Sequence, residues 1–357
     1  MNENNRRLHD LGQSLWVDNI TRGTLDDGTL KGYIEDLSVT GLTSNPTIFE
    51  KAIGGGNDYD AQIAELAASE SDPEQIFFEL AMADLRRAAD DFEEIHEKTD
   101  RVDGYVSLEV SPLLADDTEA TIAQAADLYK RIDRKNVFIK IPGTPAGLPA
   151  IEETIFAGIP VNVTLLFSTE QYLAAADAYL KGVERRIEAG LNPAINSVAS
   201  LFISRWDAAV IDDVSPELRA KLGLAVGKQA YAAYRELIAS DRVQILANQG
   251  GRIQRLLMAS TGTKDPEASD VLYIEALAAP NTVNTMPPAA LEAYADHGVT
   301  GAPIPPDGGD AEEVLKAYND AGTDTDELAA RLQSEGKDSF NASWHDLIST
   351  IKDQIPS

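Results

Sequence analysis

One lysine and two carboxylates lie within apolar segments of this chain, where burying a charge is costly. Lys140 lies between Ile139 and Ile141, while Asp18 and Glu109 lie in two other apolar runs. Burial disfavours the ammonium form of a lysine, and a neutral amine attacks a ketone to give a carbinolamine and then an imine. A protonated imine accepts the electron pair of an adjacent carbon–carbon bond as that bond breaks. The two carboxylates are suited to carry the protons that these steps move.

The elements that position these residues are short β-branched runs alternating with amphipathic stretches. Eight strands are predicted, at Leu15–Asn19, Val39–Asn45, Tyr105–Val110, Val137–Ile141, Pro160–Phe167, Ala194–Ser200, Leu256–Ser260 and Thr282–Thr285. Helices are predicted at Glu74–Lys98, Glu119–Arg134, Thr169–Ala189 and Pro216–Ala239, with Ser168 and Gln171 as a capping box. Eight alternations predict an α/β fold, a (β/α)8 TIM-type barrel. A doubly wound open sheet is the competitor, and the absence of GxGxxG and GxxxxGK[ST] motifs argues against it.

Side-chain alternation along these strands places polar groups on the interior face. In Pro160–Phe167, alternation directs Val161, Val163 and Leu165 toward the helices. The opposite, inward positions of five strands hold Trp16, Asp18, Gly41, Thr43, Asn45, Ser107, Glu109, Ser111, Phe138, Lys140, Asn162 and Thr164. Lys140 alone is open to a simpler interpretation, as a solvated or ion-paired lysine. Together, these residues predict an active site at the carboxyl ends of the strands.

Composition excludes several classes of protein. The chain has no cysteine, and its four histidines lie far apart, which argues against thiol nucleophiles, disulfides and a metal site. Its net charge of −29 disfavours binding to nucleic acid or anionic membranes. No apolar run is long enough to span a membrane, and the first residues do not resemble a signal peptide, so a cytoplasmic location is expected.

The last part of the chain has a different pattern. Residues Ala302–Gly309 contain three prolines and two glycines, and Glu312–Ser357 reads as helical. We interpret residues 1–357 as one barrel domain, with 302–357 as C-terminal helical decoration.

Six segments of the sequence, taken together, resemble the transaldolase family. They are WVDNI, GLTSNPTIFEKAI, VSLEVSP, VFIKIPGTPAGLPAI, IPVNVTLLFS and SVASLFISRWD. The resemblance runs from about Leu8 to His297. It implies a class I aldolase-type barrel, without cofactor or metal, whose imine lysine lies on the fourth strand. It also implies transfer of a dihydroxyacetone unit from sedoheptulose 7-phosphate to glyceraldehyde 3-phosphate, giving erythrose 4-phosphate and fructose 6-phosphate in the pentose phosphate pathway.

The same motifs imply catalytic roles. Lys140 in FIKIP would form the Schiff base, and Asp18 in WVDN would act as acid and base on the substrate C4 hydroxyl. Glu109 in SLEV would act with Thr164 in NVTLLF, through a water, in the carbinolamine and imine steps.

The implied binding residues fall into two groups. Asn45, Asn162 and Thr43 would contact the three-carbon unit, while Ser200 and Arg205, in a Ser-x4-Arg pattern, and Lys264 would position the phosphate. Simpler interpretations stay open for several of them. Asn45-Pro46 suits a turn, and Ser200 suits an ordinary small residue facing the barrel. Arg205 could pair with Asp207 or Asp212, and Lys264 could be a solvated loop lysine.

Two rival functions remain from the sequence. One is a fructose 6-phosphate aldolase, which releases the three-carbon fragment instead of transferring it. Relatives that release it carry a tyrosine that protonates the enamine, and Phe167 after NVTLL favours transfer. The other rival is a barrel that binds without catalysis. The expected partners are phosphorylated sugars, and the sequence leaves monomer and homodimer both open.

Overall fold

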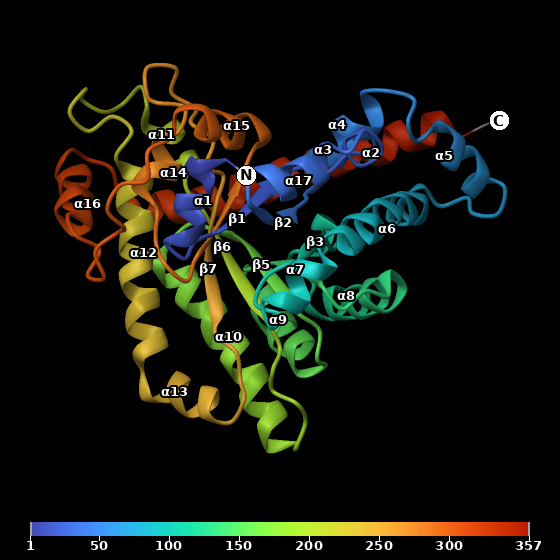
Figure 1. Ribbon diagram of the computed structural model, residues 1–357, viewed down its shortest axis with the longest axis horizontal. Helices are drawn as coiled ribbons and strands as arrows, with labels where there is room; N and C mark the ends of the chain where they lie inside the picture. Colours follow the sequence, from blue (N-terminus) through green and yellow to red (C-terminus); the bar gives the residue numbers. More distant parts are fainter. Residues whose placement is uncertain (1, 356–357) are drawn as a thin grey trace.

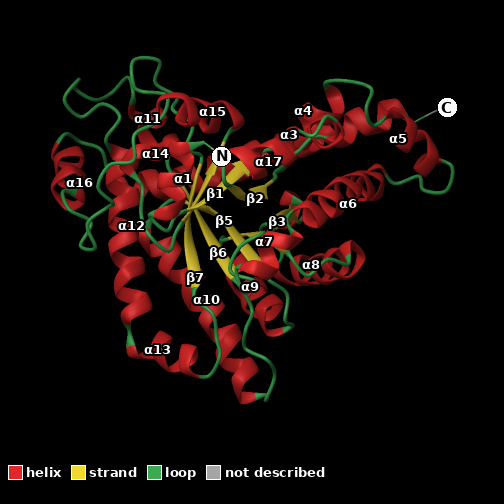
Figure 2. Ribbon diagram, viewed as in Figure 1, coloured by secondary structure: helices red, strands yellow, loops and turns green. Residues whose placement is uncertain are grey.

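Eight parallel strands form the centre of the protein in a computed structural model that describes residues 2–355 (Figure 1). Their order is β2-β1-β8-β7-β6-β5-β4-β3, with helices between them, so the predicted (β/α)8 barrel is confirmed. Figure 2 shows the strands gathered inside a layer of helices. The strands are β1 Ser14–Asp18, β2 Val39–Thr43, β3 Val106–Glu109, β4 Val137–Pro142, β5 Val161–Leu166, β6 Ser197–Phe202, β7 Gln254–Ala259 and β8 Val283–Met286.

The helices of the first half of the chain surround β1 to β5. They are α1 Glu3–Asp10, α2 Arg22–Asp26, α3 Thr29–Asp36, α4 Pro46–Gly54, α5 Asp60–Ala67, α6 Pro73–Asp91, α7 Glu93–Lys98, the 3-10 turn η1 Pro112–Leu114, α8 Thr118–Ile132 and α9 Gly147–Phe156. The helices of the second half are α10 Thr169–Glu188, α11 Ser204–Val210, α12 Leu222–Ala239, α13 Asp241–Asn248, α14 Leu272–Ala276, α15 Pro288–His297, α16 Ala311–Asp320 and α17 Thr325–Gln354.

The barrel closes between β2 and β3 by a short seam. Two backbone hydrogen bonds cross it, from Leu42 N to Tyr105 O and from Gly104 N to Thr40 O, both 2.9 Å. Gly41 makes this approach possible, because a Cβ at this position would lie 2.8 Å from the Tyr105 carbonyl oxygen and closer still to a tryptophan ring. The register of the neighbouring ladder is regular and sets Glu109 of β3 beside Lys140 of β4.

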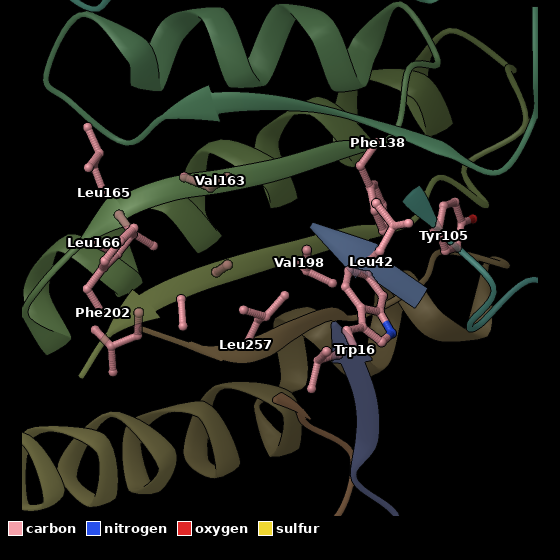
Figure 3. Close-up of a cluster of buried hydrophobic side chains, with 14 of the residues drawn as sticks. Trp16, Leu42, Tyr105, Phe138, Val163, Leu165, Leu166, Val198, Phe202 and Leu257 are labelled. Carbon is pink, nitrogen blue, oxygen red and sulfur yellow. The ribbon is translucent and has the colours of Figure 1, made fainter. Parts of the chain in front are cut away.

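Aromatic side chains pack against one another from three of the strands or strand starts (Figure 3). The rings of Tyr105 and Phe138 stack with centroids 4.0 Å apart, and Trp16 lies 6.1 Å from Phe138. All three side chains are buried. The inward orientation predicted for Trp16 and Phe138 is therefore confirmed.

The predicted alternation fails at the end of β5. Leu165 has a φ of +58°, and the pairing of β5 with β6 shifts register between Val163 and Leu166. The Leu165 side chain packs near Gly336 of α17, so it does not continue the outward set of Val161 and Val163. A bulge of this kind redirects a side chain at the rim of a barrel.

The predicted starts of two helices, α10 and α12, agree only in part with the structure. Ser168 caps α10 by accepting a hydrogen bond from Gln171 N at 3.1 Å, as predicted. The Gln171 side chain, however, accepts from Phe167 N at 2.7 Å, so the reciprocal half of the capping box lies one residue earlier. The helix predicted from Pro216 begins at Leu222, after a segment of turns.

The segment predicted as helical, Glu312–Ser357, is mostly helical in α16 and α17, and its last two residues, 356–357, lie outside the described residues. Asp324 caps α17 by accepting hydrogen bonds from Asp326 N and Glu327 N. Figure 1 shows α17, in red, running from the strand ends past α4 toward α5, and contacts with α4, α6 and β5 agree. The assignment of residues 302–357 as decoration of one domain stays a prediction. Within residues 2–355, no helix is long and apolar enough to cross a membrane.

Candidate active site

A cavity of about 310 Å³ opens at the carboxyl ends of the strands. Parallel barrels place their active sites at this end, because the loops that follow the strands converge there. The cavity is lined from seven of the eight strand ends or following loops and from α17, by Asp18, Thr43, Asn45, Thr47, Ile48, Lys51, Lys140, Thr164, Ser200, Phe202, Arg205, Ala259, Ser260, Gly262, Lys264, Thr285, Pro287, Ser339 and Phe340.

Lys140 lies at the base of this cavity. Its Nζ is 3.0 Å from Glu109 Oε2 and donates a hydrogen bond of 3.1 Å to the Ser44 carbonyl oxygen. The Lys140 and Glu109 side chains are only 5% and 4% exposed. The two charges are in contact, yet no described residue, Lys140 included, gives either Glu109 oxygen a well-aligned hydrogen bond. The simpler interpretation of Lys140 as an ion-paired lysine is therefore correct for its contacts, and Lys140 also lines the cavity.

Both carboxylates have a raised pKa. Burial raises the pKa of Glu109, with a smaller contribution from the negative charge of Asp18, while the Lys140 charge opposes the shift. Burial likewise raises the pKa of Asp18, against the charges of Lys140 and Lys264 and a hydrogen bond from Thr43. A carboxyl whose pKa is moved toward neutrality exchanges protons more readily at neutral pH.

Asp18 is held by a hydroxyl group of the neighbouring strand β2. Thr43 Oγ1 donates to Asp18 Oδ1 at 2.6 Å and lies 2.6 Å from Thr285 Oγ1. The register aligns Asp18 of β1 with Thr43 of β2, which brings the two side chains together. Thr43 thus lines the cavity as predicted and also orients a carboxylate.

Asn45 and Thr164 both line the cavity. Asn45 Oδ1 accepts a hydrogen bond from Ile48 N at 3.1 Å and caps α4, which has Pro46 at its first position. Asn45 thus ends the strand segment, as the turn interpretation of Asn45-Pro46 expected, but it does so by capping a helix, and its side chain also lines the cavity. Thr164 Oγ1 is buried without a hydrogen-bond partner within the described chain.

Asn162 lies within the barrel next to the cavity wall. Its side-chain nitrogen donates to Ser107 Oγ at 3.2 Å, and its oxygen accepts from Ser200 Oγ at 2.7 Å. Asn162 is fully buried and, unlike Ser200, does not line the cavity. Its direct role in binding a hydroxyl stays a prediction, and its observed contacts orient Ser200.

Arg205 lies between two aromatic rings at the cavity wall. Its guanidinium carbon is 5.3 Å from the centroid of Phe202 and 5.9 Å from that of Phe340. Burial lowers the pKa of Arg205. The alternative pairing with Asp207 is wrong, because Asp207 accepts hydrogen bonds from two backbone nitrogens at the start of α12 and from Tyr273.

Three cations line the cavity without a carboxylate partner in residues 2–355. They are Arg205 after β6, Lys264 after β7 and Lys51 of α4, after β2. In a chain with 59 acidic residues and only 30 lysines and arginines, most basic side chains have carboxylates available to them. Unpaired cations in one cavity provide an attractive site for an anionic ligand.

The sequence interpretation missed Lys51, Phe202 and Phe340 as lining residues. Phe202 follows the predicted Ser200 by two positions, so alternation along the strand could have identified it. Phe167 stacks on Phe202 at 5.2 Å and does not line the cavity, so the phenylalanine relevant to the aldolase question is Phe202. No cluster of potential metal ligands occurs among the described residues.

Comparisons with known proteins agree with this geometry. The model of the family described as Transaldolase/Fructose-6-phosphate aldolase matches residues 15–351. The chain is 46% identical to a protein named Transaldolase from Saccharopolyspora erythraea, over 99% of this chain and 98% of that protein. It is 44% identical to one from Mycolicibacterium paratuberculosis, over 100% and 98%, and 45% identical to one from an Arthrobacter species, over 99% and 97%.

Proposed function

Because this chain belongs to the transaldolase/fructose-6-phosphate aldolase family, we propose that it transfers a dihydroxyacetone unit from sedoheptulose 7-phosphate to glyceraldehyde 3-phosphate through an imine on Lys140. The products are erythrose 4-phosphate and fructose 6-phosphate. The chain is an enzyme, a transferase, as are its relatives named Transaldolase. The observation that carries the proposal is the 3.0 Å contact of Lys140 Nζ with Glu109 beside a cavity that Asp18 also lines.

Imine formation needs a proton acceptor close to the amine. Glu109 Oε2 is in contact with Lys140 Nζ and can take its proton, after which the amine attacks the ketone carbon of the donor. The carbinolamine hydroxyl then leaves as water, with a proton returned from Glu109. Thr164 lines the cavity, and its Oγ1 is buried with no hydrogen-bond partner among the described residues, which supports a role in holding the water that moves in this step.

Cleavage needs a base on the hydroxyl of C4. Asp18 lines the same cavity, and Thr43 holds one of its oxygens at 2.6 Å. When Asp18 removes the C4 hydroxyl proton, the C3–C4 electron pair moves into the protonated imine and forms an enamine, while the aldose leaves. The acceptor aldehyde reverses these steps, with Asp18 returning its proton to the new hydroxyl.

The remaining cavity residues match the two ends of a ketose phosphate. Asn45 and Thr43 line the cavity and offer hydrogen bonds to hydroxyl groups of the three-carbon unit. Arg205, Ser200 and Lys264 provide charged and hydroxyl donors for the phosphate. A guanidinium suits phosphate because its planar donors match two oxygens at once.

Borohydride trapping tests the proposal. Fructose 6-phosphate and borohydride together should fix a three-carbon adduct, and peptide mapping should locate it on Lys140. Lys140→Ala should abolish both the adduct and transfer, because the proposed imine and its electron sink both require the Lys140 amine. An unmodified wild-type protein would favour a non-catalytic barrel and reject the proposal.

Fructose 6-phosphate cleavage is the second candidate, because the matching family includes that aldolase. The two activities share every step up to the enamine. In transfer the enamine then attacks an acceptor aldehyde, whereas in the aldolase reaction it is protonated and released as dihydroxyacetone. Incubation with fructose 6-phosphate alone separates them. Dihydroxyacetone release at the rate of transfer would identify an aldolase, and release only far below that rate would support transfer.

A further inference from the structure

Phe340 of α17 lies at the cavity and is not part of any strand or strand-end loop. Its ring centroid is 5.7 Å from Lys140 Nζ and 5.9 Å from the Arg205 guanidinium carbon. The side chain is 3% exposed, although most polar residues around it on α17 face solvent. The ring is therefore close both to the group that would hold the imine and to a group that would hold the phosphate.

The first half of α17 is fixed to the strand ends by backbone contacts. Gln333 Nε2 donates hydrogen bonds to Leu165 O at 2.9 Å and to Gly143 O at 3.2 Å. Gly336 lets the helix approach closely, because a Cβ there would lie 3.1 Å from Leu165 Cδ2 and 3.4 Å from Arg205 Nη1. The bulge at Leu165 thus forms the seat for the turn of helix that precedes Phe340.

The second half of α17 is fixed by different contacts. Ser343 Oγ lies 2.7 Å from Thr47 Oγ1 of α4. The Trp344 ring packs against Phe77 and Phe78 of α6, with centroids 5.1 and 5.7 Å away. With anchors on both sides of it, Phe340 is held over the cavity.

We propose that Phe340 is a positioning residue that closes the cavity over the enamine on Lys140 and so sets the ratio of transfer to release. This inference rests on the proposed function and names a residue that decides whether the enamine is transferred or released. An apolar ring at this place keeps bulk water from the reactive carbon while leaving the carbon chain of the donor between the two cations.

The reaction that competes with transfer is release of dihydroxyacetone from the enamine. Water delivers a proton to C3 of the enamine, whose electron pair forms the new C–H bond while the nitrogen becomes a protonated imine. The hydroxide left by that proton transfer adds to C2, the proton of the new hydroxyl passes to the nitrogen, and the C–N bond breaks with its electrons going to Lys140 as the C2 carbonyl forms. One dihydroxyacetone leaves for each water consumed. In transfer, the same carbon attacks the acceptor aldehyde instead. Excluding bulk water slows the protonation of C3, a step that only release uses, while imine hydrolysis is common to both reactions.

Phe340→Ala and Phe340→Leu test the inference in the full chain. Release of dihydroxyacetone from fructose 6-phosphate alone is compared with transfer in the presence of glyceraldehyde 3-phosphate. We expect the ratio of release to transfer to rise roughly tenfold in the alanine variant. The leucine variant should lie between it and the wild type, because leucine keeps part of the apolar cover.

Trp344→Leu is the matched control, because it removes an aromatic ring one turn farther along α17 that does not line the cavity. It should lower thermal stability and leave the ratio unchanged. An equal rise in the control would assign the effect to helix docking and overturn the role of the Phe340 ring. An unchanged ratio in Phe340→Ala would overturn it as well. Borohydride trapping on wild-type Lys140 separates either result from a failure of the proposed function, which would give no adduct at all.

Discussion

The contact of Lys140 with Glu109 makes the stability of the fold and, under the proposed mechanism, catalysis depend on the same two charges. At an effective dielectric constant of about 20, opposite unit charges 3.0 Å apart attract by about 5–6 kcal/mol. Removing one partner of a buried pair costs about 3–5 kcal/mol, because the other charge is left in an apolar environment. Glu109→Gln should therefore lower the free energy of unfolding by about that amount, a large part of the 5–15 kcal/mol typical of a native protein.

Lys140→Met should cost less and should change the pH dependence. The pKa of Glu109 is already raised by burial above 4.5, and removing the opposing Lys140 charge raises it further. The native state of this variant then binds a proton that the unfolded state has released. Its stability is highest below about pH 4.5 as far as Glu109 is concerned, and falls as pH rises from there through the raised native pKa.

Urea unfolding of the two single variants and the double variant, Glu109→Gln with Lys140→Met, gives the coupling energy. We expect the double variant to lose at least about 2 kcal/mol less than the sum of the single losses. The pH series is measured on Lys140→Met and on wild type. Additive losses within about 0.5 kcal/mol, or a Lys140→Met variant whose stability rises with pH above 5, would refute the reasoning.

Two further predictions concern the reaction. Asp18→Asn should still form the borohydride adduct with dihydroxyacetone, because the imine steps use Glu109, while the rate of C3–C4 cleavage falls by about 10²–10⁴-fold; equal loss of trapping and cleavage would contradict this division. Arg205→Ala should lower kcat/KM for fructose 6-phosphate by about tenfold to a hundredfold, through loss of charged hydrogen bonds, with little effect on unphosphorylated fructose. Lys51→Ala should act in the same direction by about two- to fivefold, and steady-state kinetics with both sugars shows whether either effect depends on the phosphate.

The barrel and the centre of its site could be predicted from local sequence. A strand that carries Lys140 on its inward face must direct it toward the inward residues of adjacent strands, and Glu109 lies directly beside it in the β3–β4 register. Asp18 and Thr43 meet for the same reason across β1 and β2. Successive side chains of a strand point to opposite faces whatever the rest of the chain does. This alternation can therefore be predicted from one sequence alone.

The contacts that the sequence interpretation missed depend on the chain beyond each strand. Phe340 contacts Lys140 although the two residues are 200 positions apart in the sequence. The sequence of the helix that carries Phe340 predicts only that one of its faces is apolar, and does not predict what that face contacts. Leu165 broke the alternation because a bulge turns the backbone there, and single-strand periodicity carries no signal for it. Ser44 contributes a carbonyl oxygen, which every residue has.

The seam between β2 and β3 has a consequence for the free enzyme. Lys140 Nζ contacts Glu109 on the β3 side and the Ser44 carbonyl on the β2 side, and Ser44 Oγ donates to Ser107 O across the same gap at 2.8 Å. The Lys140 amine thus makes contacts with both edges of the sheet at this seam. Under the proposed mechanism, converting it to an imine removes at least part of these contacts, so amide hydrogens along the seam should exchange faster with solvent during turnover than at rest.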